Sequence, residues 1–236
     1  MNNPPTNSPF SILSRLRACL GLKLVLLVVL NLWVYVPYHF LQRYQFYPGT
    51  EIPASILDSL IPFSDHMVWL YLSIYLLMPI GPFLMTGRPQ LIRYAVGIAL
   101  ISLLADLVFF FWPTTCPRPV VEAVNPAYRL LVLIDNPFHA FPSLHAAFAV
   151  YSALCLELLW RELRGGWFWR GGVWAWTFLI LMATLATSQH MIVDLVAGSV
   201  LAIGVFYCVV KPRTARVNRK PLPTAVTLTE PDSTTQ

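Results

Sequence analysis

Charged residues are scarce in this sequence: they make up 11% of its 236 residues, whereas 57% of the residues are hydrophobic. A soluble domain usually carries charge on about a quarter of its residues. The composition therefore excludes an ordinary water-soluble fold and indicates an integral membrane protein. Cysteine is scarce as well. The four cysteines show no metal-binding or redox spacing, so no disulfide framework is implied.

Long apolar segments, by contrast, recur along the chain. A helix needs about 20 apolar residues to cross a hydrocarbon layer of ~30 Å, and six segments approach that length. We therefore predict an all-α integral membrane fold, a bundle of six transmembrane helices. The predicted spans are Leu22–Leu41, Met67–Leu84, Leu91–Trp112, Pro142–Leu159, Gly172–Ala186 and His190–Val210.

The first predicted span follows basic residues, as a signal peptide's apolar region does, but no small-residue cleavage site comes after it. We expect this span to remain part of the protein. Three regions result: a mobile N-terminal segment at 1–18, a six-span membrane domain at 19–210 and a disordered basic tail at 211–236. We find no internal repeat and no soluble second domain.

The distribution of basic residues orients the predicted bundle. With six spans both termini lie on one side, and only Arg43, Arg118 and Arg129 fall on the other. By the positive-inside rule both termini are cytoplasmic. The net charge of +5 thus reflects topology and gives no reason to expect a nucleic-acid partner. We expect a protein of the plasma (inner) membrane with its histidines at the extracytoplasmic ends of the spans.

Two short stretches carry candidate chemistry. Phe141-Pro142-Ser143-Leu144-His145 is a proline-containing turn that brings a serine and a histidine to the start of the fourth span. His190 starts the sixth predicted span, and Asp194 follows four residues later. Residues four apart share a face of a helix, so Asp194 is expected to accept a hydrogen bond from the His190 ring and fix its tautomer.

These groups suit the binding of a phosphate. Both histidines are expected at helix N-termini, where unpaired backbone N–H groups and the positive end of the helix dipole favour an anion. Arg118, in the preceding outer loop, adds a guanidinium that matches phosphate oxygens. Asp106, inside the third span, is costly in lipid and is expected to face the bundle or a wet cavity. It is either a structural carboxylate or a neighbour of the site.

The two histidines differ in whether the sequence offers them a carboxylate partner, and this difference suggests their roles. His190, paired with Asp194, can attack phosphorus and form a phosphohistidine. His145 has no carboxylate partner in the sequence and suits protonation of the leaving oxygen, followed by activation of water or an alcohol. The Ser143 hydroxyl and nearby backbone N–H groups can hold the equatorial oxygens.

The combination carries a resemblance to a known family. Arg118-Pro119, Pro142-Ser143-Leu144-His145 and the His190-to-Asp194 series resemble the type 2 phosphatidic acid phosphatase superfamily of six-span lipid phosphatases and phosphotransferases. The resemblance covers roughly Leu91–Val210, and it agrees in the order and spacing of the motifs. Within this superfamily, the sequence around the two histidines is more similar to the branch that contains inositol phosphorylceramide synthase than to the soluble acid phosphatases.

The resemblance implies specific roles for these residues. It implies that His190 is the nucleophile, Asp194 its partner and His145 the general acid. It also implies that Arg118 and Ser143 are phosphate ligands, and that the reaction needs no metal or other cofactor.

Three positions depart from the family pattern. Phe111 stands seven residues before the arginine, where the first motif has a lysine. Thr184 and Ser188 stand where the family, or its synthase-like branch, often carries a basic residue. The phosphate is thus expected to be held by fewer fixed cations, with Arg129, Gln189 or a cationic substrate headgroup compensating.

The sequence leaves several functions open. The residues predict a lipid phosphatase that cleaves a phosphate or diphosphate on the extracytoplasmic face, but they serve a lipid phosphotransferase equally well. The two histidines and Asp194 could instead bind zinc or iron as a facial triad, although the arginine favours an anion. A non-catalytic lipid-binding or flipping protein could retain the same fold. The expected partners are a lipid phosphate and membrane lipids; the sequence fixes neither the lipid nor the oligomeric state.

Overall fold

The computed structural model describes residues 12–118, 125–135 and 137–210. This part of the chain is 74% helical with almost no sheet, which confirms a helical, membrane-like fold. Residues 12–17, expected to belong to a mobile segment, form the short helix α1 (Ile12–Arg17). The predicted C-terminal tail lies outside the described residues.

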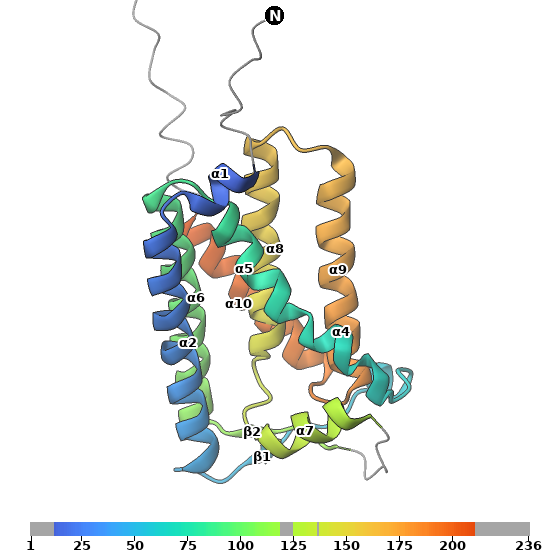
Figure 1. Cartoon of the computed structure of the whole chain (residues 1–236). Coiled ribbons are helices and arrows are strands. Elements are labelled where there is room, and N and C mark those ends of the chain that lie inside the picture. Colours follow the sequence, from blue (N-terminus) through green and yellow to red (C-terminus); the bar gives the residue numbers. More distant parts are fainter. Residues whose placement is uncertain (1–11, 119–124, 136, 211–236) are drawn as a thin grey trace, which may run out of the picture.

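Six helical segments run alternately between the two ends of the molecule (Figure 1). They are α2 (Leu20–Arg43), the pair α4 (Val68–Leu72) and α5 (Ile74–Leu84), α6 (Arg88–Phe111), α8 (Leu144–Glu162), α9 (Trp167–Ala186) and α10 (Ile192–Val209). Each corresponds to one predicted span with shifted boundaries. We call the end that carries α1 the α1 end, and the opposite end, where α8 and α10 begin, the site end.

Five helices of the described chain are long and apolar enough to cross a membrane. They are Leu20–Arg43, Asp65–Leu84, Arg88–Phe111, Trp167–Ala186 and Ile192–Val209. Helix α8 is not among them, because His145, Glu157 and Arg161 lower its apolar character. The prediction of six spans with cytoplasmic termini is therefore not confirmed and stays a prediction.

Helix α8 lies at the centre of the bundle. Ala146, Ala147 and Ala149 are fully buried in it, and such small side chains let α5, α9 and α10 pack closely around it. Gly198 of α10 lies against the start of α8, where an added Cβ would overlap the carbonyl oxygen of Ser143. The beginnings of α8 and α10 are thus fixed relative to each other by close backbone contact.

Helices α4 and α5 together form one kinked segment. Pro79 and Pro82 lie inside α5, where each lacks the N–H group that an uninterrupted helix would use. Helix α5 runs obliquely across the bundle, so that it diverges from α2 towards the site end (Figure 1). Helix α2 packs mainly on α6 and exposes apolar side chains such as Val25, Val28 and Val36 along its outer side.

Short elements cover the site end. They are β1 (Thr50–Glu51), α3 (Ile56–Ser59), the 3₁₀ turn η1 (Asp65–Met67), β2 (Thr114–Thr115) and α7 (Pro126–Ile134). The two strands pair in parallel, with Thr50 opposite Thr114 and Glu51 opposite Thr115. This pairing ties the loop after α2 to the loop after α6, just before Arg118.

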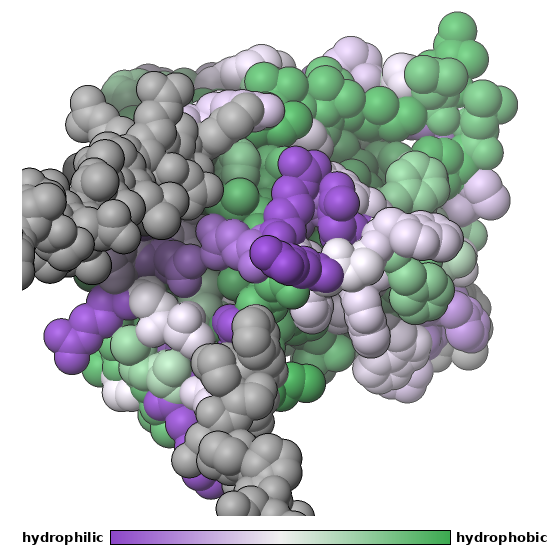
Figure 2. Space-filling model, turned by 90° about the horizontal axis from the view of Figure 1, so that it is seen from above, coloured by the Kyte–Doolittle hydropathy of each residue, from purple (hydrophilic) through white to green (hydrophobic). Residues whose placement is uncertain are grey.

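The α1 end is closed by polar contacts. Lys23 Nζ donates hydrogen bonds to the carbonyl oxygens of Arg15 and Phe83, both at 2.7 Å, and Arg15 Nη1 donates to the carbonyl of Leu84 at 3.2 Å. These bonds join α1, α2 and α5. Viewed from this end, hydrophilic residues gather near the centre of the surface, and hydrophobic residues lie mainly in the upper part of the picture (Figure 2).

Candidate active site

The first turn of α8 presents His145. Ser143 is the N-cap of this helix, and its Oγ accepts a hydrogen bond from the Ala146 N–H at 3.2 Å. The Ser143 N–H donates to the carbonyl of Asp194 at 3.1 Å. His145 therefore lies at the start of a helix, as the sequence predicted. Ser143 also links α8 to α10.

His190 approaches from the other direction, and here the structure differs from the expected helix. Helix α10 begins at Ile192, so His190 precedes it and does not share a helical face with Asp194. The turn between α9 and α10 includes Ser188 with a positive φ of 52°. This turn aims the His190 ring at the start of α8.

The two imidazoles lie close together at the site end. Their ring centroids are 6.2 Å apart, and the ring planes meet at 51°. His145 and His190 come from opposite sides of the contact between α8 and α10, which the close approach of Gly198 fixes. Both residues also line one cavity.

The hydrogen bond of His190 differs from the expected one. Its Nδ1 lies 2.9 Å from the carbonyl oxygen of Ala140 but 3.6 Å from Oδ2 of Asp194. Because a carbonyl only accepts, Nδ1 carries the hydrogen and Nε2 keeps its lone pair. The fully buried Asp194 instead accepts from the Met191 N–H at 2.8 Å. The carbonyl thus fixes the tautomer, while the carboxylate lies at salt-bridge distance from the ring.

His145 has a partner that the sequence did not indicate. The hydroxyl of Tyr71, on α4, lies 3.3 Å from Nδ1 of His145, and the two rings stack with centroids 4.2 Å apart. Tyr71 is 1% exposed, and a buried hydroxyl with one partner satisfies its proton by donating it. Nε2 of His145 then carries the hydrogen, and it is buried with no hydrogen-bond partner in the described chain.

Arg118 is held beside the site by two residues. Its Nη1 donates to the carbonyl of Asp135 at 2.7 Å, and its Nη2 donates to Oε1 of Gln189 at 2.8 Å and lies 3.6 Å from Oδ2 of Asp135. Gln189 directly precedes His190 and is itself anchored through Nε2 to the carbonyl of Thr187 at 3.1 Å. The structure therefore places Arg118 next to the His190 turn.

The start of α10 is less open to an anion than the sequence suggested. The Ile192 N–H donates to Oδ1 of Asp58, from α3, at 2.8 Å, and Asp194 takes the N–H before it. Burial acts to raise the pKa of Asp58, but hydrogen bonds from Ser55 and Ile192 bring it below its ordinary value. Carboxylates thus occupy N–H groups that were expected to be available for phosphate.

None of the three other predicted residues lines the cavity that the described chain forms beside the histidines. Ser143 is fully buried, so that its contacts here are those of a helix cap. Arg129 lies on α7 with its residue exposed. Asp106, on α6, is 9% exposed and accepts a hydrogen bond from Ser102 Oγ at 3.2 Å. As expected, Asp106 faces inward, but it does not line the cavity beside the histidines.

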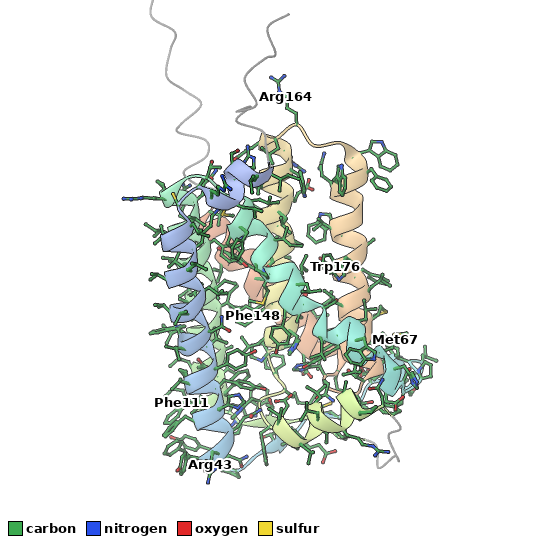
Figure 3. The ribbon with its side chains drawn as sticks, in the orientation of Figure 1. Arg43, Met67, Phe111, Phe148, Arg164 and Trp176 are labelled. Atoms are coloured by element: carbon green, nitrogen blue, oxygen red, sulfur yellow. The ribbon has the colours of Figure 1, made fainter. Side chains whose placement is uncertain are left out.

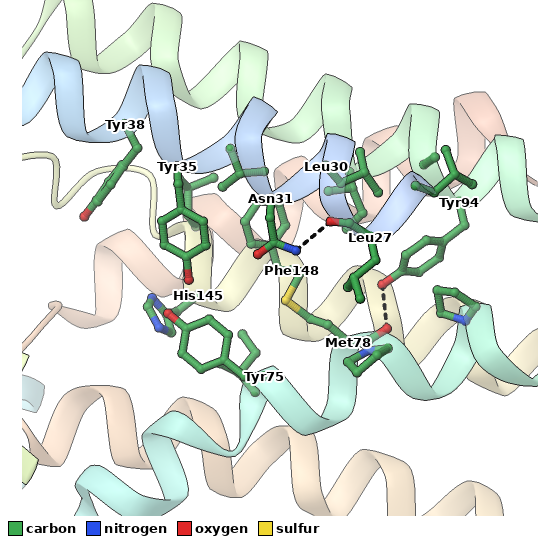
Figure 4. Close-up of a pocket in the computed structure, with 18 of the residues that line it drawn as sticks. Leu27, Leu30, Asn31, Tyr35, Tyr38, Tyr75, Met78, Tyr94, His145 and Phe148 are labelled. Carbon is green, nitrogen blue, oxygen red and sulfur yellow. Dashed lines mark hydrogen bonds between the residues drawn. The ribbon is translucent and has the colours of Figure 1, made fainter. Parts of the chain in front are cut away.

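A cavity of about 390 Å³ opens beside the two histidines. We call it the chamber. It lies between α2, α5, α6 and α8, and its lining includes His145, His190 and Asp135 at the site end and Lys23 at the other. Most of the lining between these ends is apolar. In Figure 4 the hydroxyls of Tyr35 and Tyr75 lie near the ring of His145.

His139 is a second residue that the sequence alone did not single out for the site. It lines the chamber, is 3% exposed and stacks on Phe109 with ring centroids 4.9 Å apart. Burial lowers the pKa of His139 to about 4, and the nearby Asp135 offsets only part of that shift. His139 is therefore neutral at physiological pH, and its Nδ1 has no hydrogen-bond partner among the described residues.

Comparison with known families decides the identity of this fold. A family model described as the PAP2 superfamily matches residues 50–208, which is more than half of the chain. The chain belongs to the PAP2 superfamily. Members of this superfamily are phosphatases or phosphotransferases, so membership supports a phosphoryl-transfer enzyme. No curated protein and no solved structure matches the chain.

This PAP2 superfamily protein differs from the expected pattern at three cation positions. Phe111 is 64% exposed and points away from the bundle (Figure 3). A lysine at this position with the same side-chain direction would point away from the histidines. Thr184 is fully buried and donates to the carbonyl of Ile180 at 2.7 Å. Ser188 lies in the turn before His190, where Cys116 Sγ is 4.0 Å from its carbonyl.

Potential metal ligands are dispersed in this member of the superfamily. Within residues 12–118, 125–135 and 137–210, no three side chains of His, Cys, Asp or Glu are grouped so as to hold a metal ion. Burial raises the pKa of the Cys116 thiol to about 12, and thiolate is the form that binds metals. Cys116 therefore contributes no ready ligand beside the two histidines.

Proposed function

We propose that this protein is a membrane-embedded lipid phosphatase that cleaves a lipid phosphate or diphosphate through a phosphohistidine at His190. The observation that carries the proposal is the arrangement of the two rings, 6.2 Å apart with different nitrogens available. The carbonyl of Ala140 leaves a lone pair on Nε2 of His190. The hydroxyl of Tyr71 leaves a hydrogen on Nε2 of His145. A nucleophile and a proton donor thus face one small space.

The first step forms a bond between phosphorus and Nε2 of His190 and breaks the bond between phosphorus and the leaving oxygen. The proton for that oxygen comes from Nε2 of His145, in its protonated form, as the oxygen departs. His190 keeps its Nδ1 hydrogen on the carbonyl of Ala140, and Asp194, 3.6 Å away, offsets the positive charge that develops on the ring.

The second step returns both rings to their starting state. Water attacks the phosphohistidine while Nε2 of His145 takes up one of its protons, the bond between nitrogen and phosphorus breaks, and inorganic phosphate leaves. During this cycle Nδ1 of His145 keeps its hydrogen and donates it to the Tyr71 hydroxyl oxygen, while Nε2 gives up and takes back the transferred proton. Before the ring is protonated for turnover, the same hydroxyl can donate to Nδ1. A tyrosine therefore serves both charge states.

Arg118 is the cation proposed to hold the phosphate. Its guanidinium lies beside the His190 turn through Gln189, and the planar fork matches two phosphate oxygens. Asp135 neutralises part of this charge and also accepts hydrogen bonds from Tyr38 and Gln42 at 3.0 and 2.7 Å. Ser143 and Gln189 are proposed as supporting residues, whereas Arg129 and Asp106 do not line the chamber and are given no role in this proposal.

The chamber supports a lipid rather than a small polar substrate, because an apolar cavity continues directly from the two histidines. By the positive-inside rule the site end faces the extracytoplasmic side of the plasma (inner) membrane. Reporter fusions to either terminus test this orientation. Both should report a cytoplasmic location, and an external reading at either terminus contradicts it.

The transferase alternative uses the same site, with an alcohol in place of water in the second step. Purified protein should therefore be incubated with a panel of lipid phosphates and lipid diphosphates, while free phosphate and new phospholipid are followed together. A phosphatase releases phosphate at the rate of substrate loss. Phosphate that appears instead in a new phospholipid identifies a phosphotransferase.

Two additions to this assay separate the remaining alternatives. A chelator should leave the rate unchanged, whereas loss of activity that zinc or iron restores favours a metal site. His190→Ala should abolish turnover, with His66→Ala as a matched control because His66 is an exposed histidine paired with Asp65. Full function in His190→Ala instead identifies a non-catalytic lipid-binding or flipping protein.

A further inference from the structure

The chamber is long as well as apolar. Its lining on α2 extends from Lys23 to His39, and at a rise of 1.5 Å per residue this stretch of helix covers ~24 Å. Half of a typical hydrocarbon layer is only ~15 Å thick. A chain that starts at the histidines and follows the chamber therefore passes beyond the depth of one leaflet while it lies against the lining on α2, α5 and α8.

The chamber is also narrow. Its volume is about 390 Å³. This lies near the lower end of the ~300–1,000 Å³ of pockets that take a single small ligand. A chamber of this size suits one hydrocarbon chain better than two.

Polar contacts of Lys23 and Arg15 close the end of the chamber nearest α1. We call this closure the floor. Lys23 is 3% exposed, and its ammonium group is tied to the carbonyls of Arg15 and Phe83. Arg15 in turn binds the carbonyl of Leu84, so α1, α2 and α5 close this end together. A hydrocarbon chain cannot replace these polar contacts, so the floor limits how far a chain can enter.

We propose that the chamber binds a single hydrocarbon chain of the substrate and that the floor at Lys23 sets the longest chain accepted. This inference rests on the proposed function, and it narrows the substrate to lipid phosphates that place one unbranched or slender chain inside the protein. Any second chain remains in the surrounding lipid. The phosphate then lies between the two imidazoles, and the chain runs from there towards α1.

The test measures turnover of n-alkyl phosphates from octyl to eicosyl. In the wild-type protein kcat/KM should rise with chain length and fall once the chain reaches the floor. Leu30→Trp places a large ring in the chamber about 10 Å from Lys23 along α2, and it should move the optimum to chains several methylenes shorter. Val29→Trp is the matched control, because Val29 is 51% exposed and does not line the chamber.

Phenyl phosphate, which has no alkyl chain, separates the two proposals. Leu30→Trp should leave its hydrolysis unchanged, whereas His190→Ala should abolish it. An unchanged chain-length optimum in Leu30→Trp overturns the chamber proposal and leaves the phosphatase intact. Retention of all hydrolysis in His190→Ala overturns the phosphatase itself.

A second measurement keeps the proposal testable if Leu30→Trp fails to fold. A long alkyl phosphate with a photoreactive diazirine at its chain end should label wild-type protein next to the floor, at residues such as Leu26 and Phe83 that line the chamber. Labelling confined to outward-facing residues such as Val28 overturns the proposal.

Discussion

Both ends of the chamber bury polar groups, but within the described chain some of these groups at the site end lack a hydrogen-bond partner, whereas the ammonium group at the α1 end has partners. At the α1 end Lys23 gives its hydrogen bonds to two backbone carbonyls at 2.7 Å. At the site end Nε2 of His145 and Nδ1 of His139 are buried without a partner among the described residues. A buried polar group without a partner costs free energy. The unused nitrogens thus mark the end where a ligand is expected, and Lys23 marks a structural closure.

The largest expected effect comes from removing Arg118, whose guanidinium is held beside the His190 turn by its hydrogen bond to Gln189. Arg118→Ala should lower kcat/KM for a lipid phosphate by about a hundredfold to a thousandfold, as loss of a charge-stabilising group commonly does. Arg118→Lys should recover only part of the activity, because an ammonium cannot form the two parallel bonds of a guanidinium. Arg43→Ala, an exposed arginine at the same end, should have normal activity. Normal activity in Arg118→Ala contradicts its assignment to the phosphate.

The close contact between α8 and α10 should be nearly as sensitive. Gly198→Ala inserts a Cβ where it would overlap the Ser143 carbonyl, and relief of such overpacking typically costs about 1–3 kcal/mol. We expect lower thermal stability and at least a tenfold loss of kcat, because the two rings move apart. Gly204→Ala, in the same helix with open space around it, should change neither quantity. Equal behaviour of the two variants would show that this contact does not position the rings.

A smaller and more selective effect is expected at Tyr71. Tyr71→Phe keeps the ring stack on His145 but removes the hydroxyl, so kcat should fall about tenfold for an alkyl phosphate, whose leaving oxygen needs a proton. A nitrophenyl phosphate, whose leaving group departs without one, should be hydrolysed almost normally. Tyr94→Phe is the control, because its hydroxyl binds the Met78 carbonyl, away from the histidines. An equal loss on both substrates in Tyr71→Phe would falsify the link to proton transfer.

A substitution in the floor should lower the stability of the protein and leave its catalytic activity unchanged. Lys23→Met removes both hydrogen bonds that the ammonium group donates, to the carbonyls of Arg15 and Phe83, so the free energy of unfolding should fall by about 1–3 kcal/mol. Turnover of phenyl phosphate at a temperature where the variant is folded should stay normal. Loss of this turnover in a folded variant would show that the two ends of the chamber do not have separate roles.

The sequence was informative about what depends on local pattern. Apolar runs located all six helical segments, and the turn at 141–145 placed His145 at the start of a helix, since capping by Ser143 is a local interaction. The assignment of Asp194 as a hydrogen-bonded partner failed in detail, because α10 begins two residues after His190. The spacing of four residues then no longer describes a helical face.

The missing parts of the site depend on contacts across the fold. Tyr71 lies 74 positions from His145 in the sequence, on the kinked α4–α5 segment, and no local pattern marks it. Asp58 caps α10 from 134 positions away. The tautomer of His190 depends on a backbone carbonyl, which every residue possesses. Only the packing of α4, α8 and α10 selects which of these groups meet.

The covalent intermediate at His190 is the most direct test of the account. Protein quenched during turnover of a phosphate-labelled lipid should carry the label, and mapping should place it on His190. His145→Ala should still become labelled while its turnover slows, whereas His190→Ala should carry no label. Label that persists in His190→Ala contradicts the assignment of the nucleophile.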